Sequence, residues 1–165
     1  MADVIARRPL QQSYVPSFDA KAIRILIIDD HVLVRHGVRI LLERQAGIMV
    51  VGEASNAAEA LATTLSEWPD IILLDVDVAS DLELLPELCR GIPEARAIVV
   101  TGMSDLDTHR RAVRLGAMGL VHKDQAVEVL LQAIAKVHAG EVWLERTLVA
   151  EVSGEITRGE TCPTE

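Results

Sequence analysis

The amino-acid sequence predicts one α/β domain in which helices cover both faces of a parallel β-sheet. The chain has 165 residues, 50% of them hydrophobic, which suffices for one well-buried domain and leaves little for a second. Only 2% of the residues are aromatic, so the core must be aliphatic, as in most parallel sheets that are buried on both faces. From Ala22 onward, short apolar runs alternate with amphipathic stretches, which is typical of successive βα units.

Five short apolar runs predict the strands. Most are rich in Val, Ile and Leu and are bounded by polar or turn-forming residues, as expected of buried strands. The predicted strands are 22–29 (AIRILIID), 48–54 (IMVVGEA), 70–75 (DIILLD), 95–102 (ARAIVVTG) and 118–123 (MGLVHK).

Five amphipathic stretches, one after each strand, predict the helices. Ser55 or Asn56 is expected to cap the second helix, and Gly47 to end the first. Ser104 and Asp124 are expected to be the N-caps of the fourth and fifth helices. The predicted helices are 31–47, 55–68, 81–93, 104–117 and 124–140.

Five βα units in this order leave few possible topologies, because crossovers between parallel strands are right-handed. We therefore predict a flavodoxin-like (βα)5 fold, a doubly wound five-stranded parallel sheet with strand order 2-1-3-4-5. In such folds ligands bind beyond the carboxyl ends of the strands.

The domain organisation is predicted from the segments around this unit. Residues 1–21 are expected to be a flexible leader, residues 22–140 the folded domain, and residues 141–165 a linker helix and a polar tail. The linker carries apolar residues at intervals of four, which predicts a narrow apolar stripe on a helix. These residues are Leu144, Leu148, Val152 and Ile156.

Composition excludes several classes of function. The formal net charge of −9 argues against a nucleic-acid surface on this chain and against docking on an anionic membrane. No apolar run approaches the roughly 18 residues of a membrane span, and the N-terminus does not resemble a secretory signal. Cys89 and Cys162 have neither metal-ligand nor disulfide-framework spacing, which predicts reduced thiols and a cytoplasmic location. The histidines show no paired ligand spacing, and we assign none of them a role.

Polar residues of complementary types stand at the ends of four predicted strands. Carboxylates gathered at one sheet edge repel each other unless a cation neutralises them, and Mg²⁺ prefers such hard oxygen ligands. A carboxylate beside Mg²⁺ is a good acceptor for a phosphoryl group, whose oxygens a lysine and a threonine can hold. Taken alone, each residue is an ordinary cap, surface or strand residue; together they predict a site. The residues are Asp29 and Asp30, Asp75 and Asp77, Thr101, and Lys123.

These residues lie in segments that resemble the receiver domain of two-component response regulators of the NarL/FixJ (LuxR) type. The resemblance covers about residues 22–144 and lacks the helix-turn-helix domain that usually follows in that family. The segments that carry it follow in the family's order: ILIIDDHVLVRHGVRILLE, VVGEASNAAEAL, IILLD, VVTG, GLVHKD and AGEVWL.

The resemblance implies that Asp75 accepts a phosphoryl group from a histidine kinase. Asp30 and Asp75 would ligate Mg²⁺ directly, together with the backbone carbonyl of Asp77. Asp29 would act on the ion mostly through water.

The resemblance also implies how the signal is passed on. Thr101 would be the switch hydroxyl, Lys123 would pair with the phosphoryl group, and Leu120 stands where the family commonly has a switch aromatic. The output would be a partner or a DNA-binding domain that controls transcription, with DNA contacted only through a separate C-terminal domain. Homodimerisation is possible, and no membrane partner is expected.

Two alternatives stay open at this stage. The loop VDVASDLELL after Asp75 lacks the family's Met-Pro pair and a following Gly, which changes its backbone path. The chain could therefore be a phosphorylation-independent receiver that serves as an interaction or dimerisation module. The LLDVDV stretch also matches the D-x-D nucleophile of haloacid-dehalogenase-type phosphatases, although that family places it on the first strand. The leading expectation is no enzyme, with at most self-phosphorylation and autodephosphorylation.

Overall fold

The structure, a computed structural model, describes residues 21–77, 79–146 and 148–150. The predicted leader, apart from Lys21, and the tail beyond residue 150 lie outside the described residues. The outer half of the predicted apolar stripe, Val152 and Ile156, lies outside them as well.

Between residues 23 and 138, five strands and five α-helices alternate, as predicted. The strands are β1 (Ile23–Ile28), β2 (Ile48–Ala54), β3 (Ile71–Val76), β4 (Arg96–Thr101) and β5 (Ala117–His122). The helices are α1 (Val32–Glu43), α2 (Ala57–Glu67), α3 (Leu84–Gly91), α4 (Leu106–Arg114) and α5 (Val127–His138), with a 3₁₀ helix η1 (Ala79–Glu83) before α3.

The strands form one parallel sheet with the order β2-β1-β3-β4-β5, which confirms the predicted topology. From β1 the chain adds β2 on one side and β3 on the other, so the switch point of the topology lies between β1 and β3. The carboxyl ends of these two strands flank the crevice where such folds bind ligands. Within the sheet, Val76 of β3 pairs with Thr101 of β4, and Asp75 pairs with Val100. This register brings the end of β4 alongside the end of β3.

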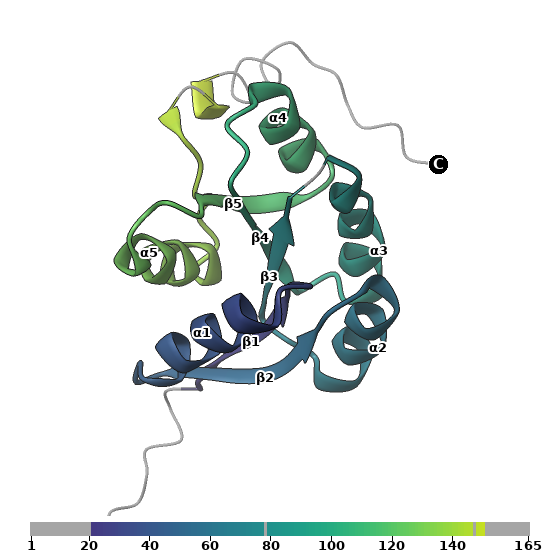
Figure 1. Cartoon of the computed structure of the whole chain (residues 1–165), viewed down its shortest axis with the longest axis vertical. Helices are drawn as coiled ribbons and strands as arrows, with labels where there is room; N and C mark the ends of the chain where they lie inside the picture. Colours follow the sequence, from purple (N-terminus) through teal and green to yellow (C-terminus); the bar gives the residue numbers. More distant parts are fainter. Residues whose placement is uncertain (1–20, 78, 147, 151–165) are drawn as a thin grey trace, which may run out of the picture.

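The sheet separates two layers of helices (Figure 1). On one face α2, α3 and α4 pack over alternate strand residues, with Leu85 and Leu88 of α3 fully buried. On the other face α1 and α5 pack through residues that include Leu42 and Ile134. Burial on both faces explains why the strands read as continuous aliphatic runs.

The helix ends agree with the sequence only in part. Asn56 caps α2, because its side-chain oxygen accepts the N–H of Glu59 at 2.9 Å. The prediction of Ser104 as a cap is wrong: Asp105 caps α4 by accepting the N–H of Thr108 at 3.0 Å. The side chain must reach the third N–H of the helix, and the residue adjoining the first turn does so.

Two further helix boundaries differ from the sequence-based expectation. Asp124 is not the cap of α5, whose N-cap is Ala126 with no side-chain hydrogen bond. Helix α1 ends at Glu43, before Gly47, which adopts a left-handed φ of 83° in the turn leading to β2. Both helices are held mainly by the burial of their apolar faces, and neither depends on a side-chain cap.

The segment after α5 returns along the edge of the sheet. Trp143 forms a parallel bridge with Gly119: its N–H donates to the Met118 carbonyl, and its carbonyl accepts the N–H of Leu120, both at 2.9 Å. Leu144 packs against the core and Leu148 is fully buried, so both described apolar residues of the predicted stripe are at least partly shielded from solvent.

Within the described part of the chain, no helix combines the length and the apolar character needed to cross a membrane.

Gly119 and Gly37 offer a matched test of this packing. A Cβ at Gly119 would lie 3.1 Å from Ile98 and 3.2 Å from Val137, both fully buried, whereas a Cβ at Gly37 would meet nothing within 4 Å. We expect Gly119→Ala to lower the free energy of unfolding by about 1–3 kcal/mol through overpacking. Gly37→Ala, in the middle of α1, should raise it by up to about 1 kcal/mol. Urea unfolding measures both, and equal shifts for the two variants would contradict this description of the core.

Candidate functional site

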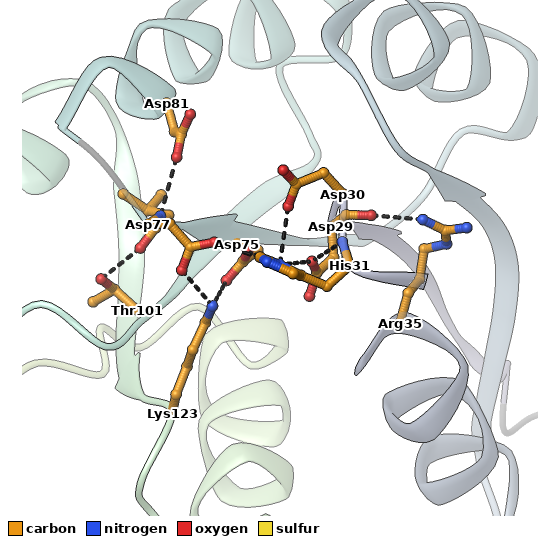
Figure 2. Close-up of polar contacts among 10 residues, drawn as sticks. Asp29, Asp30, His31, Arg35, Asp75, Asp77, Asp81, Thr101 and Lys123 are labelled. Atoms are coloured by element: carbon orange, nitrogen blue, oxygen red, sulfur yellow. Dashed lines mark hydrogen bonds and ion pairs between the residues drawn. The ribbon is translucent and has the colours of Figure 1, made fainter. Parts of the chain in front are cut away.

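Four aspartates meet at the carboxyl ends of β1 and β3 (Figure 2). The side chains of Asp29 and Asp75 are almost buried, each 7% exposed. Asp30 and Asp77 are 71% and 41% exposed and form the outer rim. The structure thus brings together the two acid pairs that the sequence placed at separate strand ends.

Lys123 reaches this cluster from the residue after β5. Its ammonium nitrogen Nζ lies 2.5 Å from Oδ1 of Asp75 and 2.6 Å from Oδ1 of Asp77. Partial burial opposes the charge of Lys123, yet these two carboxylates raise the pKa of the ammonium group. Among the described residues, Oδ1 of Asp75 is buried and has no partner with hydrogen-bond geometry, so its contact with Lys123 is an ion pair.

The environment of Asp75 disfavours its charged form. Burial raises the pKa of Asp75 to about 6, the charges of Asp29 and Asp77 add to this effect, and Lys123 opposes it. The hydrogen bond from Lys123 lowers the pKa of the more exposed Asp77. At neutral pH the cluster therefore carries several negative charges, with the inner carboxylate the most costly to ionise.

His31, which immediately follows Asp29 and Asp30, lies among all four carboxylates. Its Nδ1 is 3.0 Å from Asp30, 3.1 Å from Asp29, 3.5 Å from Asp77 and 3.7 Å from Asp75. The hydrogen bond to Asp29 and the charge of Asp30 raise the pKa of the imidazole. Sequence reasoning gave this residue no role, although its place directly after the acid pair is a usable signal.

Arg35 of α1 fixes the backbone that carries the acid pair. Its guanidinium donates to the Asp29 carbonyl at 2.6 Å and to Glu53 of β2 at 3.2 Å. Arg39, one helical turn further on, donates to the same Glu53 at 2.6 Å. The end of β1 is thereby tied to α1 and to β2.

Thr101 lies beside the cluster, but its hydroxyl points away from Asp75. The buried hydroxyl donates to the Val76 carbonyl at 2.7 Å and accepts the N–H of Met103 at 3.0 Å. The backbone of Thr101 is also tied to the site, because its carbonyl accepts the N–H of Lys123 at 2.9 Å. Leu120 is further away, buried in the core.

The loop after Asp75 follows its own path. The predicted helix 81–93 begins instead as the 3₁₀ helix η1, and α3 starts only at Leu84. The carboxylate of Asp81 accepts the N–H of Asp77 at 3.0 Å, which anchors the loop. An open pocket of about 510 Å³ extends from the acids over η1, with Ser55, Glu83 and Glu87 also in its wall.

The donor set fits a hard divalent cation. One ligand atom from each of Asp29, Asp30, His31 and Asp75 can be chosen so that all lie within 4.8 Å of one another. The three carboxylates of this group, with open solvent for water ligands, are the oxygen donors that Mg²⁺ prefers, whereas the imidazole of His31 is not.

Comparisons with known proteins point to one family. Residues 25–135 match the model of the response regulator receiver domain. The transcriptional regulatory protein LiaR of Bacillus subtilis is 33% identical over 132 residues, which are 79% of this chain and 63% of LiaR. The response regulator GacA of Pseudomonas aeruginosa is 31% identical over 133 residues, 79% of this chain and 62% of GacA. The chain thus spans less than two thirds of the length of these relatives.

Solved structures agree with this result. The crystal structure of a LuxR-family two-component response regulator from Aurantimonas sp. SI85-9A1 superimposes with a TM-score of 0.72 at 30% identity, covering 82% of this chain and 99% of that one. Receiver domains are signalling domains and not a family of catalytic enzymes, which disfavours the phosphatase alternative, as does the position of Asp75 on the third strand. The chain belongs to the response regulator receiver domain family, and its relatives are transcriptional response regulators of the LuxR/NarL type.

Proposed function

We propose that this chain is a phosphorylation-controlled receiver, in which Asp75 accepts a phosphoryl group from a histidine kinase. The observation that carries the proposal is the position of Asp75: a nearly buried carboxylate between the ammonium group of Lys123 and the acid pair of β1. In a two-component system the change at Asp75 would then be passed to a transcriptional output, with DNA contacted by a separate domain.

In the proposed reaction a carboxylate oxygen of Asp75 attacks the phosphorus atom of a phosphohistidine. The new P–O bond forms as the P–N bond breaks, and the imidazole nitrogen keeps the electron pair and takes up a proton. Asp30 and Asp75, with the carbonyl of Asp77, would hold Mg²⁺, and Asp29 would act through water. Bound Mg²⁺ neutralises charge on the phosphoryl oxygens, and Lys123 adds a charge-assisted contact to the same oxygens.

Thr101 and Leu120 are proposed to carry the response away from the site. To contact a phosphoryl oxygen, the Thr101 hydroxyl has to leave the Val76 carbonyl, which it now contacts at 2.7 Å. That rotation would free space near Leu120, which is buried where relatives commonly have an aromatic residue. Leucine presents a smaller group than an aromatic, so we expect a weaker change at the surface.

The loop after Asp75 is the observation that favours a second candidate function, one that does not depend on phosphorylation. The Asp77 N–H is held by Asp81, a contact that needs no ion and could stabilise a fixed, unswitched form. In that case the chain would act as a phosphorylation-independent interaction or dimerisation module.

Phosphorylation separates these candidates. Incubation with Mg²⁺ and acetyl phosphate, or with a cognate kinase, should give an acid-stable, hydroxylamine-labile adduct in stoichiometric amount. Asp75→Asn should abolish the adduct, whereas Asp107→Asn, an exposed acid on α4 that pairs with Arg110, should leave it unchanged. Absence of any adduct in the parent chain would favour the phosphorylation-independent module.

The raised pKa of Asp75 predicts a pH-dependent stability in metal-free buffer. The folded chain holds this proton up to about pH 6, the unfolded chain only to about 3.8, so ionising Asp75 destabilises the folded state as the pH rises through this window. Asp75→Asn should therefore raise the free energy of unfolding by about 1–3 kcal/mol at neutral pH, with the gain fading toward pH 4. Urea unfolding across this range tests it. If Asp75→Asn is no more stable than the parent at pH 7, burial does not disfavour the ionised form of Asp75.

The switch role of Thr101 has a matched pair of variants. Thr101→Ser keeps the hydroxyl, whereas Thr101→Ala removes it and leaves the buried Val76 carbonyl without its donor, at a cost of about 1–3 kcal/mol. Both should still form the adduct, but the amide resonances of α4 and β5 should respond to beryllofluoride only in the parent and in Thr101→Ser. An undiminished response in Thr101→Ala would exclude the hydroxyl from the switch.

A further inference from the structure

A second cluster of potential ligands lies apart from the acid pocket. His109 of α4, His122 at the end of β5 and Glu145 of the segment after α5 each offer one ligand atom, and these atoms all lie within 4.8 Å of one another. None of the residues proposed for phosphorylation belongs to it. Three parts of the fold that are separate in sequence therefore converge on one point.

The tautomer of His109 is fixed by a backbone contact. The side chain is buried, and its Nε2 lies 2.7 Å from the carbonyl oxygen of Met103. A carbonyl can only accept, so Nε2 carries the hydrogen, and in the neutral ring the lone pair is on Nδ1. Metal-binding histidines are commonly fixed in this way, with the second ring nitrogen donating to a backbone carbonyl.

His122 and Glu145 complete the arrangement. The rings of His122 and His109 are 5.1 Å apart between centroids and meet edge to face at 67°. Nε2 of His122 lies 3.0 Å from Oε1 of Glu145, whose side chain is half exposed. The cluster is thus enclosed by protein around the histidines and open to solvent at the glutamate.

We propose that His109, His122 and Glu145 form a binding site for one Zn²⁺ ion. Two imidazole nitrogens and one carboxylate oxygen are a usual zinc donor set, with the fourth tetrahedral position left to water. Ligand atoms around tetrahedral zinc lie about 3.4 Å apart, so atoms that are now up to 4.8 Å apart have to approach by at most about 1.4 Å, through the more exposed His122 and Glu145. Mg²⁺, which prefers an all-oxygen shell, is a poor match here, in contrast to the acid pocket.

A bound ion would join the segment after α5 to α4 and β5. That segment already contacts β5 through Trp143, and the side chain of Glu145 contacts β5 through its hydrogen bond with His122. Zinc would replace this single hydrogen bond by coordination that also includes α4. The site would thereby fix Glu145 and the segment after α5 to the domain.

The test is a Zn²⁺ titration of the full chain against a chromophoric chelator, with excess Mg²⁺ present to occupy the acid pocket. We expect one equivalent to bind. His122→Gln and Glu145→Gln should each lower the zinc affinity at least about tenfold. Even substitution of a residue that only hydrogen-bonds to a metal ligand lowers metal affinity about 10- to 100-fold. Glu141→Gln is the matched control, because Glu141 is exposed on the same segment and pairs with Lys136.

A further control variant shows whether zinc binds at the acid pocket instead. His31→Gln removes the imidazole of the acid pocket, so a loss of zinc binding in that variant alone would assign the ion to the pocket and overturn the proposal. No binding by the parent chain, or full affinity in both His122→Gln and Glu145→Gln, would overturn it as well.

Because His109 is buried, His109→Gln can also impair folding. Circular dichroism is therefore measured for every variant, and the affinities of His122→Gln and Glu145→Gln are decisive. A visible absorption spectrum of tetrahedral Co²⁺, lost in Glu145→Gln, gives an independent readout.

Discussion

The ion pair between Lys123 and Asp75 is the interaction on which the rest of the site depends. Asp75 is nearly buried beside other carboxylates, and this arrangement is costly unless a positive charge compensates it. Lys123 can supply that charge only because β5 ends at the same sheet edge as β3, with β4 between them. The strand order is therefore a condition for ionising the carboxylate at all.

The same geometry couples charge to conformation. Thr101 at the end of β4 touches both neighbours: its hydroxyl contacts the strand of Asp75, and its carbonyl accepts the N–H of Lys123. A new anionic group on Asp75 would compete for the Thr101 hydroxyl and for the Lys123 ammonium group at the same time. The folded state is less stable for carrying Asp75, since an uncharged residue at this buried position would not need to be ionised.

The sequence was a good guide wherever a local pattern decides the structure. Aliphatic runs such as IILL located the strands, because both faces of the sheet are buried and most strand side chains must therefore be apolar. The convergence of Asp75, Thr101 and Lys123 followed from the rule that ligands bind at the carboxyl ends of parallel strands. Their proposed roles rest on the family resemblance and stay predictions until phosphorylation is measured.

Contacts that depend on side-chain reach were not predictable in this way. Whether Ser104 or Asp105 caps α4 depends on which oxygen meets the third N–H of the helix, and both residue types are good caps. The contact of Asp81 with the Asp77 amide depends on the path of a loop that has no regular pattern. Sequence spacing also missed His109 and His122, because the two lie on a helix and a strand.

Strand alternation explains how two chemically different sites can share the end of β5. Successive side chains of a strand point to opposite faces, so Leu120 and His122 share the face covered by α4, whereas Val121 packs with α1 and α5. Lys123 continues this alternation and turns into the acid pocket. The two proposed sites therefore meet at neighbouring residues of one strand end and draw on opposite faces of the sheet.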